Sequence, residues 1–149
     1  MDNTISKIYS LIQDLSWYFG NQGFDGECCE DLSLVEYMAL KKVCENKDIA
    51  IQETGSTLNI TKSGISKVID RLEEKNYALR VQSSKDGRVC CVQPTEKGLN
   101  AVEKISDRYS EYLLEALNSV EHDSLANIRD VMELLYKAIR EKGYIRKNK

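Results

Sequence analysis

The stretch that decides the fold is residues 61–92, TKSGISKVIDRLEEKNYALRVQSSKDGRVCCV. Its first half places apolar residues at positions 65, 68, 69 and 72, which is the spacing of one helical face. Thr61 can cap that helix at its start, and Asn76 can adopt the left-handed backbone that ends it. From residue 79 the pattern changes to two short runs, 79–82 and 89–92, around an Asp-Gly pair. The stretch therefore predicts a helix followed by a β-hairpin.

Helices are predicted on both sides of this stretch. Apolar spacing indicates a helix over 3–19 that ends at Gly20. Ser33 and Glu36 have the spacing of a capping box, in which the hydroxyl and the carboxylate each accept a backbone N–H. This box opens a helix to about residue 44, whose inner face is Val35, Met38, Ala39 and Val43. A short helix at 51–58 and two long ones from 95 and from 123, the last ending at Gly143, complete the prediction.

Length and composition are those of one globular domain. The chain has 149 residues, of which 42% are apolar and 30% charged. No apolar run has the length of a membrane span, and the start MDNTISKIYS lacks the pattern of a secretion signal. Five cysteines are an odd number, which argues against a disulfide framework. We therefore expect a cytoplasmic protein in a reducing compartment, without a membrane partner.

The charge is unevenly distributed along the chain. The formal net charge is −3, which does not favour a generally basic nucleic-acid binder. Residues 61–91, however, hold seven Lys or Arg against four Asp or Glu, whereas residues 20–55 hold eight acids against three lysines. This segregation predicts a basic face on an acidic protein.

The order of elements is that of a helix-turn-helix with a wing. In such motifs the second helix enters the major groove with its N-terminal residues, and the hairpin meets phosphates or the minor groove. The predicted second helix carries short polar and basic side chains on the face opposite its apolar stripe, and Lys85 and Arg88 lie at the hairpin tip. The alternative is a solvated amphipathic helix with no nucleic-acid role.

The sequence resembles the MarR family of winged-helix transcriptional regulators over nearly its whole length. The resemblance rests on residues 59–76 for the turn and recognition helix, on Asp86-Gly-Arg88 for the wing tip, and on Thr95-Glu-Lys-Gly98 for the next helix. It differs where the family usually has Leu-Ala and this chain has Thr54-Gly55, so a short or frayed helix is expected there.

The resemblance implies a mainly α fold with a small β-hairpin wing, in a single domain over 1–149. Within it, residues 33–93 would form the winged helix-turn-helix lobe, and residues 1–20 and 95–145 the dimerisation helices. The implied function is that of a homodimeric repressor bound to a pseudo-palindromic site on double-stranded DNA. The alternative for the long helices is packing within one chain.

The resemblance also implies site residues. The residues expected to face the major groove are Thr61, Lys62, Ser63, Ser66 and Lys67, and Arg71 lies on the same polar face. Arg88 is the implied wing contact, with Asp86 holding its guanidinium and Lys85 beside it.

Two kinds of signal are compatible with the sequence, and no cofactor is required. Family members commonly release DNA when an aromatic compound binds, and the candidate pocket residues are Trp17, Tyr18, Tyr37, Met38, Tyr109 and Tyr112. The alternative for these residues is core and interface packing.

The second kind of signal is thiol oxidation or the binding of a thiophilic metal ion, and the candidate residues are Cys28, Cys29, Cys90 and Cys91. Adjacent strand residues point to opposite faces, so we expect Cys90 and Cys91 to differ in exposure, and the alternative is that the cysteines only pack.

Other functional classes are less well supported by the sequence. There is no glycine-rich phosphate loop, and His122 is the only histidine, so we expect no enzyme. The remaining alternative is a winged-helix module that binds a protein partner instead of a specific DNA sequence.

Overall fold

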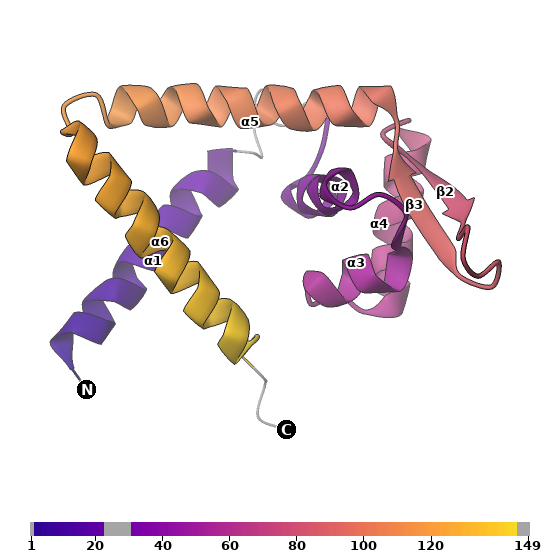
Figure 1. Ribbon diagram of the computed structural model, residues 1–149, viewed down its shortest axis with the longest axis horizontal. Helices are drawn as coiled ribbons and strands as arrows, with labels where there is room; N and C mark the ends of the chain where they lie inside the picture. The colour runs from indigo at the N-terminus through magenta and orange to yellow at the C-terminus, as the bar shows by residue number, and fades with distance from the viewer. Residues whose placement is uncertain (1, 23–30, 146–149) are drawn as a thin grey trace. The chain divides into compact units, whose positions relative to one another are not determined.

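The computed structural model describes residues 2–22 and 31–145 and is mainly helical with a small antiparallel sheet (Figure 1). This confirms the predicted fold class. The elements in chain order are α1 (Asn3–Gln22), α2 (Leu34–Glu45), β1 (Ile49–Ala50), α3 (Ile51–Thr57), α4 (Lys62–Glu74), β2 (Ala78–Gln82), β3 (Cys90–Pro94), α5 (Glu96–Ala116) and α6 (His122–Lys142). The chain divides into two compact units, residues 1–108 and 109–149, which are described separately.

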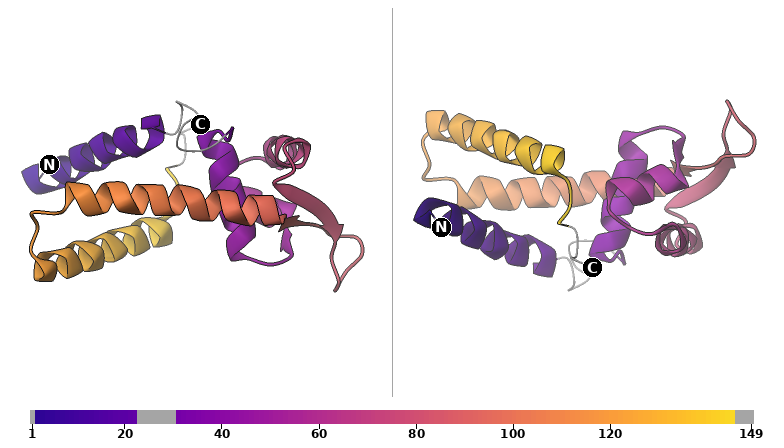
Figure 2. Two further views of the ribbon diagram at one scale, coloured as in Figure 1. Left: turned by 90° about the horizontal axis from the view of Figure 1, so that it is seen from above. Right: turned by 90° about the horizontal axis from the view of Figure 1, so that it is seen from below.

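The sheet has three strands in the order β1-β3-β2, all antiparallel. In β3, Cys91 lies between Ala50 of β1 and Val81 of β2. The β2–β3 hairpin was predicted, but β1 was not, because two residues are too few to show an alternating pattern. Both views in Figure 2 show the hairpin projecting beyond the helices α2–α4.

Helix α4 has the predicted ends and the predicted buried face. The Thr61 hydroxyl oxygen accepts the Gly64 N–H at 3.1 Å and caps the first turn. The four stripe residues at 65, 68, 69 and 72 are all buried. Asn76 has a φ of 64° and so adopts the left-handed conformation predicted for it, and Asn59, with a φ of 55°, adopts the same conformation before the helix.

The start of α2 differs from the predicted capping box in one contact. Ser33 accepts the Glu36 N–H at 3.2 Å, as predicted. The Glu36 carboxylate, however, accepts the Ser33 hydroxyl instead of the Ser33 backbone N–H. Glu36 itself is buried, with 5% of its surface exposed, because cationic side chains of α4 approach it from the other side.

The inner face of α2 is also rotated relative to the prediction. Ala39 and Val43 are buried and Met38 is half-buried, but Val35 is 45% exposed, so its assignment to the inner face was wrong. Leu40, which is fully buried, takes its place. The buried residues of α2 are Glu36, Ala39, Leu40 and Val43, which are spaced by three or four and therefore share one face of the helix.

Helix α3 is short, as expected from Thr54-Gly55, but these two residues at its centre are buried. Thr54 is fully buried, and its hydroxyl donates to the Ala50 carbonyl at 3.2 Å. A Cβ atom at Gly55 would lie 2.9 Å from a methyl carbon of Ile65 in α4. The glycine therefore permits the close approach of α3 and α4 that forms the helix-turn-helix.

Other element boundaries moved by a few residues. Helix α1 continues through Gly20 to Gln22, where a stop at Gly20 was predicted, because one glycine costs a helix only about 1 kcal/mol. Strand β2 begins one residue earlier than predicted and ends at Gln82 as predicted. Strand β3 begins one residue later and ends two residues later than predicted, at Pro94, which is paired with Ala78. Helix α6 ends at Gly143, which has a positive φ as expected.

The core of the first unit is formed by α2, α3, α4, the sheet and the first turns of α5. Its buried apolar residues are Leu32, Ala39, Leu40, Val43, Ile49, Ile65, Val68, Ile69, Leu72, Tyr77, Ala78, Cys91, Val92, Ala101 and Ile105. By contrast, α6 buries none of its residues. Among the described residues, no helix is long and apolar enough to span a membrane.

The start of α5 is fixed by a close backbone contact. The Thr95 N–H donates to the Tyr77 carbonyl at 3.0 Å, and the Thr95 hydroxyl oxygen accepts the Gly98 N–H at 3.0 Å. A Cβ atom at Gly98 would lie 2.1 Å from the same Tyr77 carbonyl oxygen. The glycine of the Thr-Glu-Lys-Gly motif is therefore required by the approach of α5 to the end of α4.

We expect Gly98→Ala to destabilise the protein by about 1–3 kcal/mol, because the added methyl group must displace backbone. Urea unfolding followed by circular dichroism measures this change. Gly87→Ala is the matched control, because a Cβ at Gly87 meets nothing within 4 Å, and it should change the free energy of unfolding by less than about 0.5 kcal/mol. Equal stability of the two variants would contradict the close contact.

Candidate nucleic-acid interface

The outward face of α4 carries the side chains that were predicted to face the major groove. Thr61, Lys62, Ser63 and Lys67 are exposed, and Ser66 is half-buried. These residues occupy the N-terminal half of the helix, on the side away from the buried stripe. The first turn contains no acidic residue, so no carboxylate of that turn opposes the partial positive charge of its N–H groups. This end of α4 is therefore suited to a polyanion.

The wing tip holds the three predicted wing residues in exposed positions. Lys85, Asp86 and Arg88 all lie in the connection between β2 and β3. The Ser83 hydroxyl oxygen accepts the backbone N–H groups of Lys85 and Asp86 at 3.2 and 3.3 Å, and the Ser83 N–H donates to the Val89 carbonyl at 3.0 Å. Among the described glycines only Gly143 has a positive φ, so the Asp-Gly pair does not form the left-handed turn that it favours.

Asp86 orients Arg88 differently from the way the resemblance implies. Its carboxylate accepts the backbone N–H of Arg88 at 3.0 Å. The expected contact was with the Arg88 guanidinium. The carboxylate thus shapes the backbone of the tip, and the guanidinium remains at the surface.

Arg71 lies on the last turns of α4 and faces a buried acid. Its Nε atom is 3.6 Å from one carboxylate oxygen of Glu36, and Lys75 Nζ is 2.7 Å from the other. The Arg71 side chain is nonetheless about half exposed. Arg71 therefore differs from the other predicted DNA contacts, because part of its charge balances Glu36.

Two important polar residues were not found from the sequence. Glu36 was interpreted only as part of a capping box, and Arg80 was not singled out. Arg80 is in β2, where its guanidinium forms ion pairs with Asp70 and Glu73 of α4. A sequence signal for Arg80 is its position between the strand residues Leu79 and Val81, where an unpaired charge would be costly.

A polar cluster surrounds the C-terminal end of α4. The Tyr77 hydroxyl donates to the Asp31 carboxylate, which lowers the pKa of Asp31 below its ordinary value, and the nearby charges of Lys75 and Lys97 act in the same direction. Lys75 also donates to the Asp31 carbonyl, and Lys97 Nζ donates to the Lys75 carbonyl at 2.7 Å. The segment before α2, the end of α4 and the start of α5 are therefore connected.

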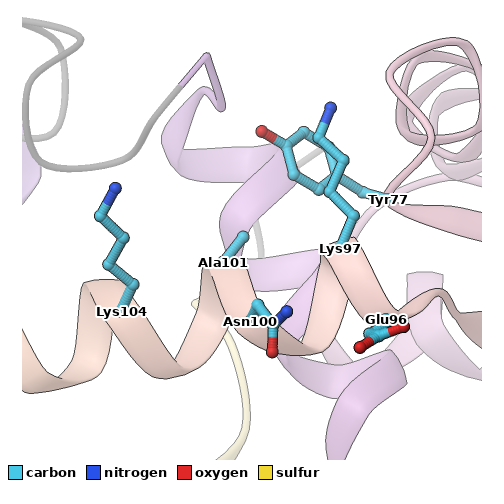
Figure 3. A pocket seen from close by; sticks show the side chains of 6 residues that line it. All are labelled: Tyr77, Glu96, Lys97, Asn100, Ala101 and Lys104. Carbon is cyan, nitrogen blue, oxygen red and sulfur yellow. The ribbon is translucent and has the colours of Figure 1, made fainter.

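An open pocket of about 420 Å³ lies beside this cluster. Figure 3 shows its lining residues, which are Tyr77, Glu96, Lys97, Asn100, Ala101 and Lys104. Lys97 Nζ lies 4.4 Å from the centre of the Tyr77 ring, which is a cation–π distance. Five of the six lining residues belong to the first turns of α5.

The six predicted pocket residues do not line this cavity. Trp17 is 70% exposed, and Tyr18 and Tyr112 are exposed as well. Tyr37, Met38 and Tyr109 are half-buried. A ligand site formed by these six side chains stays a prediction.

The cysteines of the hairpin point to opposite faces, as expected. Cys91 is buried in the core and Cys90 is exposed. Cys44 is half-buried, and burial, together with the nearby Glu45 charge, raises its pKa to about 11. Cys28 and Cys29 lie outside the described residues. In residues 2–22 and 31–145, no group of three or more His, Cys, Asp or Glu side chains has the arrangement of a metal site.

The comparisons with known proteins agree with this geometry. Residues 28–105 match the family model of the transcriptional regulators SarA/Rot. An uncharacterized helix-turn-helix transcriptional regulator of Bacillus subtilis, YpoP, is 25% identical over 108 residues, which are 72% of this chain and 77% of that protein. These relatives are named as regulators, consistent with the expectation of a non-enzymatic protein.

Solved structures with the same fold come from several bacteria. A MarR family protein from Bacillus stearothermophilus superposes with a TM-score of 0.81 at 18% identity, covering 93% of this chain and 97% of that one. FabT of Streptococcus pneumoniae, solved in complex with DNA, gives a TM-score of 0.75 at 17% identity and covers 94% and 97% of the two chains. The fold is therefore that of the MarR-type winged helix.

We expect alkylation to distinguish the described cysteines. At pH 8 a thiol with a pKa of about 11 has on the order of a hundredfold less thiolate than an ordinary cysteine, and thiolate is the reactive form. Brief treatment with iodoacetamide should therefore modify the exposed Cys90 well before Cys44, and Cys91 should react only on unfolding. Mass spectrometry of the digested protein measures the order, and faster modification of Cys44 than of Cys90 would contradict it.

Proposed function

The chain belongs to the SarA/Rot family of transcriptional regulators and has the MarR-type winged-helix fold, and from this premise we propose that it is a homodimeric repressor that binds a specific DNA sequence. The observation that carries the proposal is the exposed polar N-terminal face of α4 beside a hairpin with a basic tip. These are the two elements with which winged helices contact the major groove and the adjacent backbone.

The proposed contacts divide into base-reading and phosphate-binding residues. On α4, the short polar side chains of Ser63 and Ser66 can contact base edges when the helix lies in the major groove. Lys62 and Lys67 supply positive charge beside them. On the wing, Lys85 and Arg88 bind phosphates or enter the minor groove. Thr61 and Arg71 have a second role within the chain, because Thr61 caps α4 and Arg71 pairs with Glu36.

The proposed DNA-binding lobe is 33–93, and residues 1–20 and 95–145 are proposed to form the dimer. Support comes from the apolar side chains that the single chain leaves uncovered on its terminal helices. Those on α1 are Ile5, Ile8, Tyr9, Leu11, Leu15, Trp17 and Tyr18, and those on α6 include Ile128, Val131, Met132, Leu134, Tyr136 and Ile139. Exposed apolar surface of this extent is typical of obligate interfaces. A dimer would present two copies of α4 to a pseudo-palindromic operator.

Release from DNA is proposed to follow either an aromatic ligand or a change in thiol state. For the second route, Cys90 is the exposed residue among the three cysteines that the structure describes, and it lies directly after the wing connection. Gel shift with alkylated protein tests this route, with Cys90→Ser as the control that alkylation should leave unaffected. The alternative function, a winged helix that binds a protein, predicts no preference among DNA sequences.

We expect Arg88→Ala to weaken binding to a selected DNA duplex on the order of tenfold at fixed salt, because it removes one cationic contact. The slope of log affinity against log salt should fall by about one. Gel shift at several salt concentrations measures both quantities. Lys142→Ala, which removes one exposed charge from α6, should change neither. Unchanged binding by Arg88→Ala would remove the wing from the interface.

We expect Leu134→Asp to convert the proposed dimer to a monomer. Leu134 is 69% exposed in the single chain, and a charge at this position would be buried if α6 forms the proposed interface. Sedimentation equilibrium measures the mass. Asn127→Asp adds the same charge at a polar, exposed position of α6 and should leave the dimer intact. A dimeric Leu134→Asp protein, or a monomeric wild type, would contradict the proposed role of α6.

A further inference from the structure

Arg80 of β2 makes a set of contacts with one face of the recognition helix α4. Its Nη2 atom lies 2.7 Å from the Asp70 carboxylate and donates to the Ser66 carbonyl at 3.1 Å and to the Ser66 hydroxyl oxygen at 3.2 Å. Its Nη1 atom bonds to the Glu73 carboxylate, which also accepts the Arg80 backbone N–H at 3.1 Å. Residues 66, 70 and 73 share one helix face because they are spaced by four and by three.

The contact with Ser66 determines what the Ser66 hydroxyl can do. A serine hydroxyl has one hydrogen to donate and two lone pairs to accept. In Ser56 and Thr57 of α3, the hydrogen is donated to the carbonyl four residues earlier, at 2.8 and 2.5 Å. Ser66 makes no such bond within the described part of the chain, and its oxygen already accepts the Arg80 guanidinium. The Ser66 hydrogen is therefore left for a partner outside the chain.

Ser66 also lies where such a partner is expected. It is one residue from Lys67 and one helical turn beyond Lys62 and Ser63, all of which are exposed on the proposed DNA-facing side. In the major groove the acceptors are purine N7, guanine O6 and thymine O4, whereas the amino groups of cytosine and adenine are donors. A hydroxyl whose hydrogen has no acceptor in the described chain, and whose oxygen already accepts one hydrogen bond, favours the acceptor atoms over the amino groups.

We propose that Arg80 is a positioning residue for base recognition, which holds Ser66 as a hydrogen-bond donor toward an acceptor atom in the major groove. This inference rests on the proposed function, because it requires that α4 binds DNA. Arg80 itself is three-quarters buried at its side chain and is held by two carboxylates, so it acts through Ser66 and not by touching DNA.

The test is a double-mutant cycle on the tightest duplex that the wild-type protein selects from a random pool. Ser66→Ala and Arg80→Lys should each weaken binding by about fivefold, which is the effect of one neutral hydrogen bond. Lysine keeps the charge near the two carboxylates but lacks the planar fork that also reaches Ser66. The double variant should bind about as well as the weaker single variant, because both changes remove the same interaction. The salt slope should stay that of the wild type.

The control variant is Asp70→Asn, which weakens the same ion-pair cluster but leaves the contact between Arg80 and Ser66. It should bind within about twofold of the wild type, and thermal unfolding shows whether each variant folds. Additive losses in the double variant, or equal losses in Asp70→Asn and Arg80→Lys, would overturn the inference.

The base preference of Ser66→Ala, measured by selection from the same random pool, distinguishes base recognition from a purely structural role of this residue. Relaxed preference at one base pair of each half-site is expected, and an unchanged preference overturns the inference even where Arg80→Lys does not fold. If the wild-type protein selects no sequence at all, the proposed function itself is wrong, so the two failures are distinguishable.

Discussion

The burial of the Glu36 carboxylate is the constraint on which the arrangement of the proposed DNA-binding lobe depends. Glu36 is only 5% exposed, and a buried carboxylate must be neutralised locally because an uncompensated buried charge is strongly destabilising. Its cationic partners are Arg71 in the last turn of α4 and Lys75 at the C-cap of that helix. Helix α2 and the recognition helix therefore have one relative position in which this charge is balanced.

The same end of α4 also holds the start of α5. The Thr95 hydroxyl donates to the Asn76 carbonyl at 2.6 Å, and Lys97 Nζ donates to the Lys75 carbonyl at 2.7 Å. Gly98 allows α5 to approach the Tyr77 backbone closely. A shift of α5 in either direction would break several of these bonds together. In the first unit, the recognition helix and the helix that leads toward the proposed dimer are thus connected through polar contacts instead of a loose linker.

The sequence was sufficient for the features that depend on local pattern. The buried stripe of α4, its Thr61 cap, the left-handed Asn76 and the hairpin all follow from spacing and backbone preference within about twenty residues. The strand β1 and the burial of Glu36 could not be predicted in this way, because each depends on a partner about forty residues along the chain. The partners of Arg80 lie within fourteen residues, but they face it only because β2 packs against α4. The exposure of Val35 was missed for a related reason, since a short helix has several apolar rows and only packing selects among them.

Helix α6 has one more consequence for the behaviour of the chain. Each of its 21 residues is exposed or half-buried, so its own unit gives it little apolar burial with which to offset the entropy of ordering a helix. In the proposed dimer, the order of α6 depends on association, and association obeys mass action. A chain that dimerises through α6 would therefore have a melting temperature that rises with its concentration, and dilution would weaken its terminal helices first.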